Sequence, residues 1–119
     1  MTSIVVTLPI RAESVANLRE GWAARHKRAK AHRHTAWAML RAEAPACAID
    51  GRIAVTITRI APRPLDSHDN LRTSTKAAVD GIADWLKLKD NDERIDWAYA
   101  QERGAPKHYA VRVEIRAAA

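Results

Sequence analysis

Residues 69–88 read DNLRTSTKAAVDGIADWLKL, and they carry the clearest helical pattern in the chain. Side chains at helical spacing share one face of this segment, which predicts a helix packed on a core: Leu71, Thr75, Ala78, Ile82 and Trp85. Three polar residues at its start are candidate N-caps: Asp66, Ser67 and Asp69. Lys87 and Lys89 crowd the other end, where cations interact favourably with the helix dipole.

Further patterns extend outward from this helix in both directions. Alternating apolar side chains predict strands over residues 3–8, 53–58, 95–100 and 109–115. The alanine-rich segment from Glu13 to about Glu43 predicts one long helix, or two helices with a break near Gly21. The turn Gly104-Ala105-Pro106 predicts that the last two strands form an antiparallel hairpin. The order β-α-β-α-β-β therefore predicts an α/β fold: a single domain over residues 1–119 with helices packed on a small mixed sheet.

The composition is that of one globular domain. The chain has 119 residues, of which 47% are hydrophobic and 29% are charged, so wholesale disorder is not expected. The single cysteine, Cys47, excludes an internal disulfide and suits a reducing compartment. No apolar run approaches the roughly 18 residues of a membrane span, and no segment after Met1 resembles a signal peptide. We therefore expect a cytoplasmic protein with no membrane partner.

The charge is distributed unevenly along the chain. The net charge is +6, but residues 1–64 hold 11 bases and 4 acids, whereas residues 65–119 hold 9 bases and 10 acids. A metal-dependent enzyme that acts on a polyanion needs this combination, because cations hold phosphates and carboxylates hold a divalent ion. A basic segment that only maintains solubility would give the same composition, so nucleic acid is allowed and not established.

The acidic segment before and within residues 69–88 is the first candidate for chemistry. Asp66 and Asp69 lie where a strand gives way to a helix, and their oxygens are the ligand type that Mg²⁺ prefers. Asp69, Lys76 and Asp80 fall on one helical face, opposite the apolar face. A lysine beside a metal site can neutralise charge that develops on a phosphate. The alternative is an N-cap aspartate and an ordinary surface pairing of Lys76 with Asp80.

A second acidic segment, Asp90-Asn91-Asp92-Glu93, follows the same helix. Aspartate and asparagine are favoured in turns, so a turn explains this segment by itself. Its functional interpretation is that the loop folds back and supplies a third carboxylate beside Asp66 and Asp69. We therefore expect these groups to converge at one end of the helix.

Residues 25–34 hold five cations and three histidines without an acid, which favours contact with a phosphate backbone. The predicted DNA-binding residues are Arg25, Lys27, Arg28, Lys30 and Arg33. The alternative is a solvated helix face. A histidine metal site at His32 and His34 is not expected, because an i,i+2 pair does not face one way on a helix. Of the four tryptophans, Trp37, Trp85 and Trp97 are expected in the core or a dimer interface, and Trp22 is left as a candidate for base stacking.

Short motifs in a fixed order run over nearly the whole chain. They are Thr7-Leu8-Pro9 at the end of the first strand, Ser14 and Asn17, the basic segment, Leu65-Asp66, Asp69-Asn70-Leu71, Lys76-Ala77-Ala78-Val79-Asp80, Trp85-Leu86, the Asp90/Asp92 loop and a closing strand pair. In this order and spacing the sequence resembles the RusA family of endodeoxyribonucleases, the Holliday junction resolvases common in prophages.

The resemblance implies a RusA-like fold and Mg²⁺-dependent hydrolysis, with Mn²⁺ as a substitute, by a homodimer that nicks four-way DNA junctions symmetrically. It implies that Asp66, Asp69 and Asp92 bind the metal and that Lys76 assists, with Asp90 as a competitor for the place of Asp92. The family commonly shows Asp-x-Asp-Asn, whereas two residues separate Asp66 from Asp69 here and Ser67 stands at the expected position. The alternative to an enzyme is a non-catalytic protein that binds branched DNA through its basic helix.

Overall fold

The computed structural model describes residues 3–13, 20–66 and 68–118. Its elements, in chain order, are β1 (Ser3–Leu8), α1 (Trp22–Glu43), β2 (Ile53–Ala61), α2 (His68–Leu86), β3 (Ile95–Arg103) and β4 (Ala110–Ala117). The four strands form one mixed sheet in the order β1-β4-β2-β3. The predicted α/β class and the β-α-β-α-β-β order are therefore confirmed.

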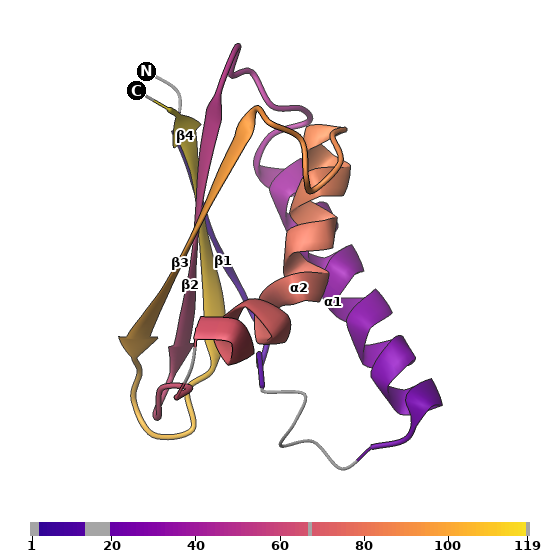
Figure 1. The fold of residues 1–119 in the computed structure, drawn as a ribbon, viewed down its shortest axis with the longest axis vertical. Coiled ribbons are helices and arrows are strands. Elements are labelled where there is room, and N and C mark those ends of the chain that lie inside the picture. Colours follow the sequence, from indigo (N-terminus) through magenta and orange to yellow (C-terminus); the bar gives the residue numbers. More distant parts are fainter. Residues whose placement is uncertain (1–2, 14–19, 67, 119) are drawn as a thin grey trace.

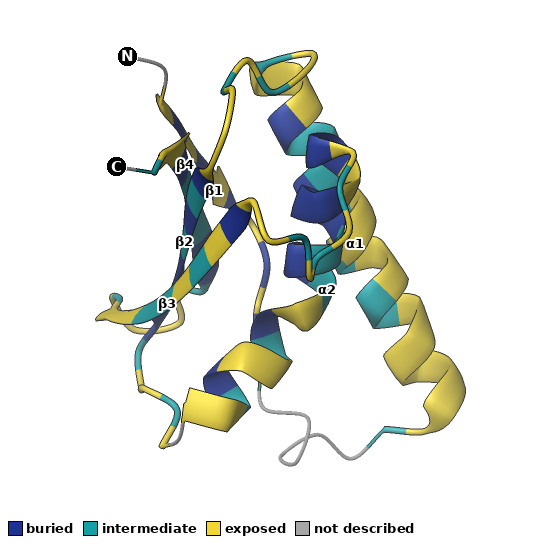
Figure 2. Ribbon diagram, turned by 45° about the horizontal axis from the view of Figure 1, so that its top comes forward, coloured by how far each residue is buried: buried dark blue, intermediate teal, exposed yellow. Residues whose placement is uncertain are grey.

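Both helices cover the same face of the sheet, so the molecule has two layers (Figures 1 and 2). The side chains buried between the layers are mostly aliphatic and come from all four strands and both helices. The largest fully buried ones are Leu8, Leu40, Ile57, Ile82, Ile115, Val55, Val111 and Val113. Each such side chain contributes about 1.5–3 kcal/mol to stability through removal from water.

The predicted hairpin of the last two strands is wrong. β4 pairs antiparallel with both β1 and β2, and β3 pairs parallel with β2 at the sheet edge. The burial of the two strands explains this order. Val111 and Val113 of β4 are fully buried, as central-strand residues are, whereas β3 ends in the exposed run Gln101-Glu102-Arg103. The more apolar strand therefore lies inside the sheet and the more polar one at its edge.

The helix boundaries differ slightly from the predicted ones. α1 begins directly after Gly21, where a break was one of the two alternatives, and the expected helical residues 14–19 lie outside the described residues. α2 ends at Leu86 because Lys87 takes a left-handed conformation with φ 59°. The amides of Lys87 and Leu88 then donate to the carbonyls of Asp84 and Ala83, which is the Schellman ending of a helix.

Gly81 lets the two helices approach closely. A Cβ at this position would lie 2.2 Å from the carbonyl oxygen of Arg33 and 2.8 Å from the Cβ of Ala36, both on α1. We expect Gly81→Ala to lower the free energy of unfolding by about 1–3 kcal/mol, because backbone must move and this outweighs the roughly 1 kcal/mol gain in helix propensity. Urea unfolding measures the change.

Gly21→Ala is the matched control for that measurement, since an added Cβ there meets nothing within 4 Å. It should change stability less than Gly81→Ala does. Equal stabilities of the wild type and the Gly81→Ala variant would contradict the close helix contact.

Candidate functional site

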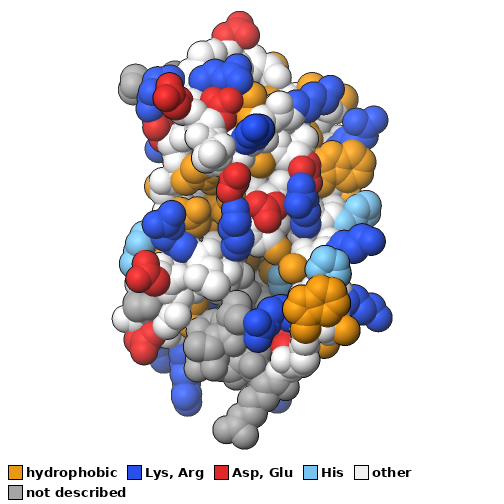
Figure 3. Space-filling model, turned by 45° about the vertical axis from the view of Figure 1, so that its right-hand side comes forward, with side chains coloured by type: hydrophobic (Ala, Val, Ile, Leu, Met, Phe, Trp, Pro, Cys, Tyr) orange, Lys and Arg blue, Asp and Glu red, His pale blue; other side chains and the backbone are white. Residues whose placement is uncertain are grey.

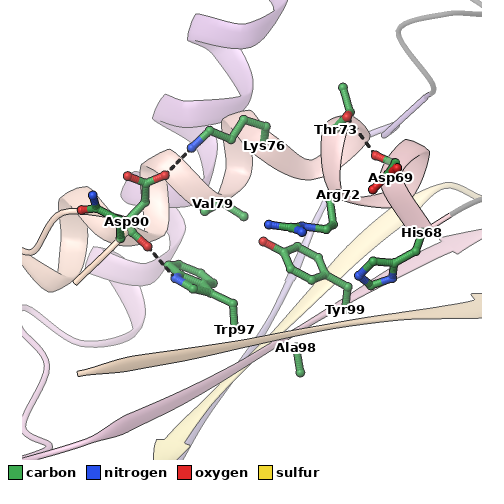
Figure 4. A pocket seen from close by; sticks show the side chains of 11 residues that line it. His68, Asp69, Arg72, Thr73, Lys76, Val79, Asp90, Trp97, Ala98 and Tyr99 are labelled. Carbon is green, nitrogen blue, oxygen red and sulfur yellow. Dashed lines mark hydrogen bonds and ion pairs between the residues drawn. The ribbon is translucent and has the colours of Figure 1, made fainter. Parts of the chain in front are cut away.

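A pocket of about 800 Å³ lies between α2, the start of the loop after it, and the middle of β3 (Figure 4). Its polar lining includes Asp69, Lys76 and Asp90, three of the residues that the sequence predicts as site residues. The other lining residues are His68, Arg72, Thr73, Val79, Asn91, Trp97, Ala98 and Tyr99. The pocket therefore gathers two carboxylates, two permanent cations and two aromatic rings.

Regular spacing on the two elements produces this lining. Residues 69, 72, 73 and 76 of α2 stand at positions i, i+3, i+4 and i+7, so their side chains lie along one side of the helix. Trp97 and Tyr99 are two apart on β3, so both point to the sheet face that the helices cover. The left-handed turn at Lys87 ends α2 and starts the loop that brings Asp90 to Lys76.

Lys76 is held by two carboxylates. Its Nζ donates to Asp90 and to Asp80 Oδ1, the latter at 3.0 Å. The hydrogen bond with Asp90 is the main cause that raises the pKa of Lys76 and lowers the pKa of Asp90. Lys76 therefore stays protonated through the physiological pH range.

The other end of the pocket is aromatic and cationic. The Arg72 guanidinium lies 5.7 Å from the centroid of the Tyr99 ring, and the His68 ring meets Tyr99 edge-on at 5.9 Å. Trp97 closes the opposite end by donating from Nε1 to the backbone oxygen of Asp90 at 2.8 Å. These contacts fix both ring planes along the wall of the pocket, as Figure 4 shows.

Two of the predicted metal ligands, Asp66 and Asp92, do not line this pocket. The Asp92 carboxylate is held by the Arg94 guanidinium at 2.9 and 3.0 Å, and this hydrogen bonding lowers the pKa of Asp92 to about 2. Asp66 Oδ1 accepts a hydrogen bond from Asn70 Nδ2 at 3.0 Å. Of the two candidates in the acidic loop, Asp90 lines the pocket and Asp92 does not.

The predicted convergence of Asp66, Asp69 and an aspartate of the 90–92 loop is not found. In residues 3–13, 20–66 and 68–118, no group of three or more His, Cys, Asp or Glu side chains could hold a metal ion. The parallel pairing of β2 with β3 is the reason. The chain leaves β2 at one end of the sheet and enters β3 at the other, so the loops on either side of α2 lie at opposite ends.

Mg²⁺ commonly takes one or two protein carboxylates and completes its shell with water and substrate phosphates. Asp69 is exposed, and its carboxylate makes no hydrogen bond or ion pair with any residue that the structure describes. Asp69 and Asp90 lie at opposite ends of the pocket, with Lys76 between them (Figure 4). Within the described residues, the pocket therefore offers the Asp69 carboxylate as a single candidate ligand, and it does not form a cage of three carboxylates.

The basic helix is only partly free to bind phosphates. Arg33 donates to both carboxylate oxygens of Asp84 on α2, at 2.7 and 2.8 Å, and Arg28 pairs with Glu20. Both arginines were predicted to contact DNA. Arg33 instead links α1 to α2 through Asp84, and Arg28 is engaged by Glu20. Arg25, Lys27 and Lys30 are exposed and form no ion pair with the described residues. Figure 3 shows lysine, arginine and histidine side chains together over the side of the molecule that α1 occupies.

Arg72, Thr73 and Tyr99 line the pocket but were not predicted as site residues from the sequence. Their signal was the spacing, since Arg72 and Thr73 are three and four residues after Asp69 and so share its side of α2. Trp85 is buried in the core as predicted, at 3% exposure, whereas Trp97 both packs against the core and lines the pocket.

A scan against known protein-family models finds no match to this chain, and no curated protein matches it either. None of the described helices is both long and apolar enough to cross a membrane.

Proposed function

We propose that this chain is a structure-selective endodeoxyribonuclease that cuts four-way DNA junctions with the help of Mg²⁺ or Mn²⁺. The observation that carries the proposal is the pocket between α2 and β3, whose lining includes Asp69, Lys76 and Asp90. These are residues on which the resemblance to the RusA family rests. The uneven charge supports the same conclusion, since the basic first half suits a polyanionic substrate.

In this proposal the residues of the pocket have different roles in the hydrolysis of a phosphodiester. Lys76 and Arg72 attract the scissile phosphate, and Lys76 offsets the negative charge that develops as the phosphate is attacked. Asp69 would hold the divalent cation, and a bound cation would supply Lewis-acid activation of the phosphodiester and of the attacking water. Trp97 and Tyr99 keep one wall of the pocket apolar beside these charges.

The free cations of α1 supply the remaining DNA contacts in this proposal. Changing Arg25, Lys27 and Lys30 together to alanine should weaken binding to every DNA sequence alike. The dependence of log K on log salt should flatten by roughly 2.7, which is about 0.9 for each of the three lost phosphate contacts. Titrations by fluorescence anisotropy at several salt concentrations measure both quantities.

The matched control removes the same charge elsewhere, by changing the exposed Arg63, Arg103 and Arg116 to alanine. It should leave the salt dependence nearly unchanged. If both triple variants flatten it equally, net charge and not α1 governs binding.

A two-fold homodimer is part of the proposal, because a four-way junction has two strands to cut symmetrically. A chain of 13.2 kDa is also small to cover a branched substrate alone. Light scattering at micromolar concentration, with and without junction DNA, tests this. Monomers under both conditions would count against it.

The second candidate function is non-catalytic binding of branched DNA on the same scaffold. The observation that favours it is that the described carboxylates form no group of three around a metal position. Incubation with a synthetic four-way junction, with and without Mg²⁺ or Mn²⁺, separates the two functions. Nicked product supports the nuclease, and a stable complex without nicking supports the binding protein.

A further inference from the structure

The first turn of α1 exposes a large aromatic side chain to solvent. Trp22 is 78% exposed, and Val5 is the only other large hydrophobic residue exposed in the described part of the chain. The imidazole of His26, four residues on, stacks on the Trp22 indole with ring centroids 5.4 Å apart and an angle of 8° between the planes. An indole that remains so exposed with one face against a second ring presents its other face to solvent.

Three exposed cations lie on the same stretch of α1 as this stacked pair. Arg25, Lys27 and Lys30 are exposed on the same turns of α1 and form no ion pair with the described residues. Figures 1 and 2 show the first turns of α1 reaching away from the sheet, so this segment is open to a large partner.

The remaining side chains of these turns indicate the class of partner. Apart from Trp22, the apolar residues between positions 22 and 31 are all alanine. A helix that lies on a membrane needs a continuous apolar face, and these turns have none. A flat ring among free cations suits nucleic acid, because cations bind phosphates and aromatic rings stack on bases.

We propose that Trp22, supported by His26, is a stacking platform for an unpaired nucleobase, with Arg25, Lys27 and Lys30 on the adjoining phosphates. The inference rests on the proposed DNA binding and adds a source of structural selectivity to it. Bases in a continuous duplex are stacked on each other and offer no free face, whereas a bulge, a gap or a branch point does. The platform therefore favours DNA with unpaired bases over intact duplex.

The test compares a continuous duplex, the same duplex with a two-nucleotide bulge, and a single strand, all without divalent metal so that no cleavage occurs. Fluorescence anisotropy gives the affinities, and 2-aminopurine as the unpaired base reports stacking by its quenching. Trp22→Ala should weaken binding to the bulged and single-stranded DNA about tenfold, within the range for losing one stacking ring. It should change binding to the continuous duplex less than twofold.

Two variants serve as controls. Trp22→Phe keeps a ring and should retain most of the affinity and the quenching. Lys27→Ala should weaken binding to all three DNAs alike. Because Trp22 is exposed, Trp22→Ala should have the melting temperature of the wild type.

The outcomes separate this inference from the proposed function. A wild type that binds neither these three DNAs nor a four-way junction overturns both. A wild type that binds DNA while Trp22→Ala affects all three DNAs equally, or none, overturns the platform alone. Loss of binding to phosphatidylserine vesicles, with DNA binding unchanged in Trp22→Ala, overturns the platform in favour of a membrane surface.

Discussion

Asp69→Asn is expected to abolish cleavage of a four-way junction. Asparagine keeps the shape of the side chain but loses the charge that holds a divalent cation. Junction binding should be unchanged or tighter, because removal of an acid from the pocket reduces repulsion of the phosphates. Single-turnover cleavage on denaturing gels and binding in the absence of metal measure the two effects separately.

Asp50→Asn is the matched control, since Asp50 is exposed and lies outside the pocket. It makes the same change of charge and should cleave at the wild-type rate. An Asp69→Asn protein that nicks the junction as fast as this control would show that Asp69 holds no catalytic metal.

Lys76→Ala is expected to lower the rate of cleavage by roughly 10²–10³, the usual cost of losing one electrostatic contact to a transition state. The ammonium lies between Asp69 and Asp90 on the pocket wall, where it can approach a bound phosphate (Figure 4). Affinity for the metal should fall less than the rate does, because lysine is not a ligand. Cleavage rates at several Mg²⁺ concentrations distinguish the two effects.

Asp80→Asn tests whether Lys76 acts directly. Asp80 accepts one of the two hydrogen bonds of Lys76, and Asp90 still holds the ammonium when that bond is removed. The substitution removes a partly exposed i,i+4 pair and should therefore cost much less than Lys76→Ala. Equal losses in the two variants would indicate that the ion pair, and not the lysine cation, is what matters.

The sequence predicted the bounds of the helices and strands better than it predicted which strands pair with each other. The strand over residues 3–8 has the predicted bounds, and α2 differs from the predicted 69–88 by one residue at its start and two at its end. Local periodicity is sufficient for this. Pairing is not local: alternation shows that residues 110–117 form a strand but not that β1 and β2 are its partners. The hairpin was inferred from a turn that instead precedes a strand in the middle of the sheet.

In the candidate site, too, local spacing was predictable from the sequence and tertiary contacts were not. Asp69 and Lys76 share a pocket because helical spacing alone places them on one side of α2. Asp90 lines the pocket and Asp92 does not. This depends on the left-handed turn at Lys87, which a non-glycine residue does not signal in a sequence. Arg33 was predicted to contact DNA, but it bonds to Asp84 of α2 because α1 passes close to α2 at Gly81. A glycine inside a helix is the one sequence signal of that close approach.

The pocket between α2 and β3 is proposed to cut branched DNA. The most direct measurement incubates the wild-type protein with an end-labelled four-way junction in Mg²⁺ and maps the products on a sequencing gel. We expect nicks at symmetric positions in two opposing strands, absent without metal and absent with Asp69→Asn. A wild type that binds the junction but leaves all four strands intact in both Mg²⁺ and Mn²⁺ would contradict it.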